Sequence, residues 1–153
     1  MNTIIVFASM AGTTELMANT LAGELTKAGD QVTVIDAFET DAEELKSYDR
    51  ILVGSYTWGD GDLSDEIMGF YDELSTIDLT GKMATAFGSG DTSYEHFARA
   101  VDILEEALKT QGCEILIKGL KVDSWTKDEE EIETKCRLFA KELMNLSSQN
   151  CIA

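Results

Sequence analysis

The chain contains no proline, one histidine and only three cysteines among its 153 residues. The single histidine, His96, excludes metal sites that are built from several histidines. The cysteines at positions 113, 136 and 151 are too far apart for a paired Cys-x-x-Cys zinc or redox motif. We therefore expect no metal site, and the odd cysteine count favours a reducing compartment, the cytoplasm.

Basic residues are also scarce. Lysine and arginine together number 12 against 29 aspartates and glutamates, which gives a net charge of −17. A charge of this sign repels nucleic acid and anionic membranes, and it attracts basic proteins from a distance. No apolar run has the length of a membrane span, and the first residues do not form a signal-peptide pattern. We expect an acidic cytoplasmic protein whose partners are basic proteins.

Length and hydrophobic pattern together predict the fold. The size suits one core, so we predict a single domain over residues 1–147 and a short C-terminal tail over residues 148–153. Continuous apolar runs predict buried parallel strands, at residues 4–8, 32–35, 51–54 and 84–87 and, with an interruption, 115–122. Apolar residues spaced three and four apart predict amphipathic helices between the strands, with a shorter helix over residues 41–46. This alternation predicts an α/β fold, a doubly wound five-stranded parallel sheet with helices on both faces.

The first predicted strand leads directly into residues 9–14, Ser-Met-Ala-Gly-Thr-Thr, which we call the first loop. Hydroxyl groups, a glycine and the N-terminus of the following helix can together bind an anion. Serine and threonine also cap ordinary helices, so the loop alone leaves both interpretations open. No lysine or arginine precedes Lys27, so a phosphate here would be held by N–H groups, hydroxyls and the helix dipole alone.

Other phosphate-binding folds need residues that this chain lacks. A P-loop nucleotidase needs Gly-Lys-Ser/Thr after the first strand, whereas the only Gly-Lys pair, Gly81-Lys82, precedes the fourth strand. The nearest match to a dinucleotide-binding fingerprint, residues 88–93, lacks the third glycine. A phosphorylated receiver domain needs acidic residues after the first strand, where Ser9 and Met10 stand.

Two further loops leave the same edge of the predicted sheet. The middle loop covers residues 54–62, Gly-Ser-Tyr-Thr-Trp-Gly-Asp-Gly-Asp, and the last loop covers residues 88–97, Gly-Ser-Gly-Asp-Thr-Ser-Tyr-Glu-His-Phe. Each presents an aromatic residue among glycines and aspartates, which suits stacking on a flat polar ring. One such aromatic alone more often anchors its own loop, but three loops converging on one edge favour a ligand site.

These motifs closely resemble those of the short-chain flavodoxins, and the resemblance covers the whole chain. It implies the flavodoxin-like strand order 2-1-3-4-5 and FMN as the cofactor. Carried over by position, Ser9, Thr13 and Thr14, with the amides of Ala11 and Gly12, would hold the FMN phosphate.

The resemblance also implies how the middle and last loops would hold the flavin ring. Trp58 and Tyr94 would sandwich the isoalloxazine, and Gly59 and Asp60 would lie beside flavin N5. Asp91 would face the pyrimidine edge. The implied cofactor site also includes Met10, Tyr56, Thr57, Ser89, Gly90 and Phe97.

Two positions depart from the family pattern. The first loop of relatives is often Thr-x-Thr-Gly-Asn-Thr, so Ala11 lacks a hydroxyl contact although its amide remains available. Tyr56 stands where many relatives have serine, which puts a contact at that position in question. Neither departure changes the expected ligand.

The resemblance implies a low-potential one-electron carrier that cycles non-covalently bound FMN mainly between semiquinone and hydroquinone. It would be an electron-transfer protein rather than an enzyme, with no catalytic residue of its own. We expect a monomer that works between a flavodoxin/ferredoxin reductase and acceptor enzymes, all of them basic-faced redox proteins. Acidic residues on the loops would attract such partners, at Glu15, Asp60, Asp62, Asp65, Glu66, Asp91 and Glu95.

Two alternatives remain open at this point. A small flavin-dependent NAD(P)H:quinone reductase would share the fold but would need a substrate pocket over the ring, and it would consume NAD(P)H without an added reductase. A binding module without flavin would stay colourless in the presence of FMN.

Overall fold

The computed structural model describes residues 1–9, 12–58, 61–91, 93, 95–123 and 128–151. Its centre is a sheet of parallel strands in the order β2 (Gln31–Asp36), β1 (Asn2–Ala8), β3 (Arg50–Trp58), β5 (Met83–Gly90). The last position is shared by β6 (Glu114–Ile115) and β7 (Leu120–Asp123), which both pair with β5. These two short strands are the interrupted fifth strand of the sequence, so the predicted order 2-1-3-4-5 is confirmed.

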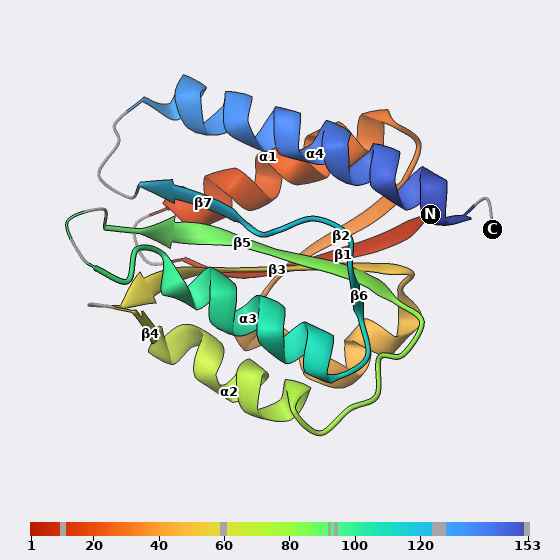
Figure 1. Ribbon diagram of the computed structural model, residues 1–153, viewed down its shortest axis with the longest axis horizontal. Helices are drawn as coiled ribbons and strands as arrows, with labels where there is room; N and C mark the ends of the chain where they lie inside the picture. The colour runs from red at the N-terminus through yellow and green to blue at the C-terminus, as the bar shows by residue number, and fades with distance from the viewer. Residues whose placement is uncertain (10–11, 59–60, 92, 94, 124–127, 152–153) are drawn as a thin grey trace.

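Helices cover both faces of this sheet (Figure 1). Helices α1 (Thr13–Lys27) and α4 (Glu129–Cys151) lie on one face, and α2 (Asp65–Leu74) and α3 (Arg99–Thr110) lie on the other. Helix α4 continues beyond residue 147, where the predicted domain ends. No helix among the described residues is both long and apolar enough to cross a membrane.

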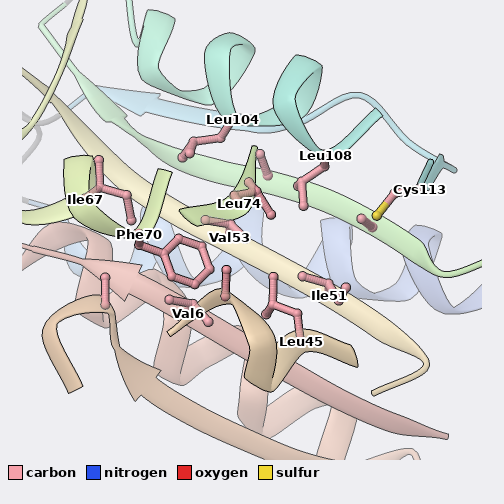
Figure 2. Packing of buried hydrophobic residues seen from close by; sticks show 14 of the residues in the cluster. Val6, Leu45, Ile51, Val53, Ile67, Phe70, Leu74, Leu104, Leu108 and Cys113 are labelled. Carbon is pink, nitrogen blue, oxygen red and sulfur yellow. The ribbon is translucent and has the colours of Figure 1, made fainter. Parts of the chain in front are cut away.

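Successive residues of a strand pack into two separate cores, because side chains alternate between the two faces of the sheet. Ile4 and Val6 of β1 pack on the α2/α3 side, whereas Ile5 packs on the α1/α4 side. Figure 2 shows the first of these cores, where Phe70 of α2 and Leu104 of α3 lie over the strands. Burial on both faces explains why the strands are continuously apolar in the sequence.

Several local features differ from the sequence-based expectation. Residues predicted as a short helix form a 3₁₀ segment, η2 (Ala42–Ser47), which Asp41 caps by accepting a hydrogen bond from Glu44 N. Another 3₁₀ segment, η1 (Ala37–Glu39), precedes it. Strands β3 and β5 extend into the polar residues that were assigned to loops, and β4 (Asp62–Leu63) pairs antiparallel with β3. Hydrophobicity cannot reveal these polar strand ends.

Candidate functional site

Strand register brings the three loops to one edge of the sheet. Ala8 at the end of β1 pairs with Ser55 of β3, and the next residue of β3, Tyr56, pairs with Ser89 of β5. The first, middle and last loops therefore leave neighbouring strands at the carboxyl edge. In open α/β sheets this edge is the usual position of ligand sites.

The first loop turns from β1 into the N-terminus of α1. Gly12 has φ +92°, a left-handed conformation that glycine adopts at little cost. Its amide donates to Ser9 Oγ over 3.1 Å, and its carbonyl accepts from Leu16 N over 2.9 Å. Thr13 is half-buried and Thr14 is buried, and these two residues begin α1. Met10 and Ala11 lie outside the described residues.

The start of α1 fits an anion such as a phosphate. Among the described residues no side chain caps this helix by a hydrogen bond to its amides, although helix starts usually have such a cap. Open space adjoins Gly12, because a Cβ built there would meet nothing within 4 Å. Unpaired helix amides and the helix dipole attract negative charge, so the start of α1 can hold a phosphate without a basic side chain.

A buried hydroxyl pair joins the first loop to the last. Thr14 Oγ1 and Ser89 Oγ lie 3.4 Å apart although 75 residues separate them. Both side chains are almost fully buried, with exposed fractions of 1% and 2%. Two buried hydroxyls that bond to each other satisfy part of their polar capacity without water. The contact fixes the start of α1 against the end of β5.

The middle loop is tied at its base by paired strands and side chains. Thr57 and Trp58 of β3 pair with Leu63 and Asp62 of β4. Ser55 Oγ lies 3.2 Å from Ser64 Oγ. Gly59 and Asp60, predicted to lie beside the flavin, fall outside the described residues. The described residues on either side of them therefore form a short antiparallel pair, β3 with β4.

The Tyr56 hydroxyl bonds within the protein, to a side chain of α2. The phenol donates a hydrogen bond to Glu66 Oε2 in the first turn of α2. Burial and the neighbouring Glu66 carboxylate raise the pKa of Tyr56 from 10.0 to about 12. The phenol is therefore protonated, and a hydrogen-bond donor, throughout the physiological pH range.

The middle and last loops also contact each other. Thr57 Oγ1 accepts a hydrogen bond of 3.2 Å from the amide of Ala100 in α3. Gly61, at φ +104°, packs so closely that a Cβ there would stand 3.0 Å from His96 Cβ and from Arg99 Cδ. Only glycine suits both this conformation and this approach. The two loops that would hold a flat ring are thus packed as one unit.

The last loop is shaped by its own polar contacts. Asp91 Oδ1 accepts from Ser93 N at 2.9 Å and from Ser93 Oγ at 2.6 Å, an arrangement typical of Asx turns. Half-buried Phe97 packs against the α2/α3 core. Its carbonyl lies 3.4 Å from Lys121 Nζ of β7, which also pairs with Asp102 at 2.6 Å. Tyr94 lies outside the described residues.

The turn into α3 contains an unusual backbone conformation. Ala98 has φ +49°, the only positive φ of a non-glycine residue in the described part of the chain. It is fully buried, and Gly90 lies so close that a Cβ at position 90 would stand 2.5 Å from the amide nitrogen of Ala98. Gly90 is therefore needed for this approach, in addition to its place in the predicted site.

The structure thus places all of the predicted site residues that it describes at or beside this edge. Ser9, Gly12, Thr13 and Thr14 lie at the phosphate-binding end, and Tyr56, Thr57, Trp58, Ser89, Gly90, Asp91 and Phe97 lie on or beside the two neighbouring loops. Sequence reasoning missed the roles of Gly61, Ser64, Glu66 and Lys121. The first-turn pattern Ser64-Asp65-Glu66 signals a helix start, but nothing in it reveals the bond to Tyr56.

Negative charge dominates the surroundings of this edge. Glu15, Asp62, Asp65 and Glu95 are exposed, and Glu66 and Asp91 are half-buried. The described residues hold no group of three or more histidine, cysteine, aspartate or glutamate side chains that could bind a metal ion. The described part of the site is therefore suited to a ligand that carries a phosphate group, and exposed carboxylates surround it.

Comparison with known proteins gives concordant matches. A family model described as flavodoxin matches residues 5–138. The Bacillus subtilis (strain 168) protein named "Probable flavodoxin 2" is 40% identical over 131 residues, 85% of this chain and 87% of its own length. The flavodoxin of Nitratidesulfovibrio vulgaris is 37% identical over 125 residues, 80% of this chain and 84% of its own length.

Solved structures agree with the sequence matches. The crystal structure of oxidised Flavodoxin 2 from Bacillus cereus has a TM-score of 0.89 and 44% identity to this chain. The match covers 95% of this chain and 99% of that one. The residues matched by the family model include the first, middle and last loops.

Proposed function

The chain belongs to the flavodoxin family, whose members are electron-transfer proteins and not enzymes, and on this premise we propose that it carries electrons on FMN bound at the carboxyl edge of its sheet. The observation that carries the choice of FMN is the start of α1. A helix N-terminus that no described side chain caps, open space at Gly12 and the hydroxyl residues around it suit a terminal phosphate. No finding supports the alternative of a small quinone reductase.

In this proposal the chain contributes binding, orientation and electrostatics. FMN, when bound, accepts and releases single electrons. The first loop holds the phosphate through amides and hydroxyls, and Trp58 and Tyr94 stack on the ring. The exposed carboxylates at this edge disfavour the addition of negative charge to the ring, which lowers the potential for its reduction.

Titration with three flavins tests the phosphate site. We expect FMN to bind more tightly than riboflavin or FAD, as measured by quenching of flavin fluorescence. Thr13→Ala should weaken the binding of FMN more than the binding of riboflavin, because it removes a hydroxyl near the phosphate. Thr20→Ala is the matched control, since that hydroxyl bonds to Leu16 O within the same helix. Riboflavin that binds wild-type protein as tightly as FMN contradicts the proposed phosphate site.

Redox partners are the second part of the proposal. The acidic edge suits docking of basic-faced proteins such as a flavodoxin/ferredoxin reductase. In this proposal the chain is a monomer when it binds such a partner. Electron transfer to a small basic cytochrome should slow as salt rises, because the Debye length falls to about 8 Å at physiological ionic strength. Asp65→Asn at the edge should reduce the rate at low salt, whereas Glu142→Gln on exposed α4 should not. A rate independent of salt argues against electrostatic docking.

A further inference from the structure

Tyr56 lies at the end of β3 beside the start of the first loop. The pairing of β1 with β3 ends at Ala8 and Ser55, so Tyr56 is the first residue of β3 beyond β1 and lies beside the start of the first loop. It is half-buried there. A hydroxyl at this position has two possible uses, since it could bind a ligand phosphate or bond within the protein.

The structure shows the second use. The Tyr56 phenol donates to Glu66 Oε2, and these two residues stand before and after the hairpin that ends β3 and forms β4. The bond between Ser55 and Ser64 closes the same segment one residue earlier on β3. Two side-chain contacts therefore join the end of β3 to the start of α2, at the base of the chain segment between them.

The chemistry of the pair excludes a simultaneous phosphate contact. A phenol has one O–H, so a hydroxyl that donates to Glu66 has no proton left for a second acceptor. The Glu66 carboxylate would itself repel a phosphate anion. The raised pKa of Tyr56 agrees with this geometry, because a protonated phenol beside a carboxylate stays a donor.

We propose that Tyr56 and Glu66 are positioning residues that hold the middle loop against the flavin ring, and that the Tyr56 hydroxyl is not a phosphate donor. The proposal rests on FMN binding at this edge. It reassigns Tyr56 from the cofactor contacts that the family resemblance implies. It also gives Glu66, on a different element, a role in ring binding that does not depend on its charge.

The decisive test compares a flavin with phosphate and a flavin without it. Tyr56→Phe keeps the ring and removes the hydroxyl, so it should weaken FMN and riboflavin by the same factor, about three- to tenfold. Tyr71→Phe is the matched control, because Tyr71 is a half-buried tyrosine of α2 that packs against the core. A loss of FMN affinity with unchanged riboflavin affinity would show that the hydroxyl is a phosphate donor and overturn the proposal.

Glu66 variants separate position from charge. Glu66→Gln retains an oxygen that can accept from Tyr56, so it should keep near wild-type affinity for both flavins. Glu66→Ala should reproduce the effect of Tyr56→Phe, and the double variant should add little to either single change. If Glu66→Gln is as damaging as Glu66→Ala, the charge matters rather than the hydrogen bond, and the proposal is wrong.

A measurement without flavin keeps this inference separable from the proposed function. In the ligand-free protein, Tyr56→Phe should speed amide hydrogen exchange of residues 61–64 several-fold, and Tyr71→Phe should not. Unchanged exchange contradicts the positioning role even if FMN binds. Wild-type protein that binds neither FMN nor riboflavin contradicts the proposed function, and with it the role of the pair toward the ring, whatever the exchange shows.

Discussion

The two edges of the sheet differ in how their charged residues are placed. Charge is buried and paired at the amino edge, and it is mostly exposed at the carboxyl edge. At the amino edge Arg50 begins β3 with an exposed fraction of only 2%. Its guanidinium donates to Thr3 Oγ1 at 3.3 Å and to Ser147 Oγ of α4 at 2.8 Å, and it forms an ion pair with Asp30. At the carboxyl edge, exposed acidic residues surround glycines, hydroxyls and a helix start that no described side chain caps.

This difference distinguishes a structural charge cluster at the amino edge from the proposed binding site at the carboxyl edge. A buried charge is tolerated only when its hydrogen-bonding groups are satisfied, and Arg50 has partners on the first strand, on the residue before the second and on the last helix. At the carboxyl edge, the first amides of α1 have no described side-chain cap and are instead available to a ligand. We therefore expect changes at the amino edge to alter stability alone and changes at the carboxyl edge to alter flavin affinity.

The largest expected effect is on the amino edge. Asp30→Ala removes the carboxylate partner of buried Arg50 and should lower the free energy of unfolding by about 3–5 kcal/mol. FMN affinity of the remaining folded protein should be unchanged. Urea unfolding and flavin titration measure the two quantities, with Asp72→Ala on the exposed face of α2 as the control. An altered FMN affinity would show that the two edges are not independent.

Substitution of the aromatic residues at the carboxyl edge should have the opposite effect, a loss of FMN affinity with little loss of stability. Trp58→Ala and Tyr94→Ala should each weaken FMN binding by about 1–3 kcal/mol, as stacking on a flat ring requires. The ligand-free protein should lose little stability. Fluorescence titration and thermal unfolding of each variant check the two parts. Unchanged affinity in both variants would remove the proposed ring sandwich.

Gly61 is a position where one substitution should affect both quantities. Alanine there must adopt φ +104° and approach His96 and Arg99 to 3.0 Å, so stability should fall by about 1–2 kcal/mol. FMN affinity should fall too, because the middle loop would separate from the last loop. Gly69→Ala is the control, since a Cβ in the middle of α2 meets nothing within 4 Å and should stabilise the helix by about 0.5–1 kcal/mol. Equal effects of the two changes would contradict this packing.

Sequence patterns predicted the buried parts of this fold better than its polar parts. Continuous apolar runs such as residues 51–54 revealed the strands and, with the family resemblance, their order, because burial on both faces leaves a direct signal in composition. The extension of β3 through Tyr56 and Thr57 was missed, since polar residues at a sheet edge look like loop residues. The sequence predicts a short helix over residues 41–46, and the shortness of this segment explains why residues 42–47 take the 3₁₀ form.

The candidate site shows the same division. Ser9, Gly12 and Thr14 were found because a strand, a hydroxyl-rich turn and a helix start are contiguous in the sequence. The contacts of Thr14 with Ser89 and of Tyr56 with Glu66 join different elements, so only the fold reveals them. Arg50 was missed for a related reason, because a lone arginine before an apolar run does not indicate burial.

The smallest expected effect is on alkaline stability, and it isolates one hydrogen bond of the carboxyl edge. The folded-state pKa of Tyr56, about 12, lies above the ordinary value of 10.0, so the folded protein holds this proton more tightly than the unfolded chain. The resulting stabilisation is fully present below pH 10 and is lost as the pH rises toward 12. Because Tyr56 is partly exposed to solvent, we expect its share of that loss to be below about 1 kcal/mol.

Tyr56→Phe should abolish the part of the alkaline loss of stability that Tyr56 contributes, whereas Tyr71→Phe should leave that part unchanged. Urea unfolding of both variants and the wild type at pH 9 and pH 11 measures the difference, and all titrating groups except Tyr56 and Tyr71 cancel because the three proteins share them. The variant should therefore lose less stability between the two pH values than the wild type. Identical losses in all three proteins would mean that Glu66 does not hold the Tyr56 proton in solution, so this pair could not position the middle loop.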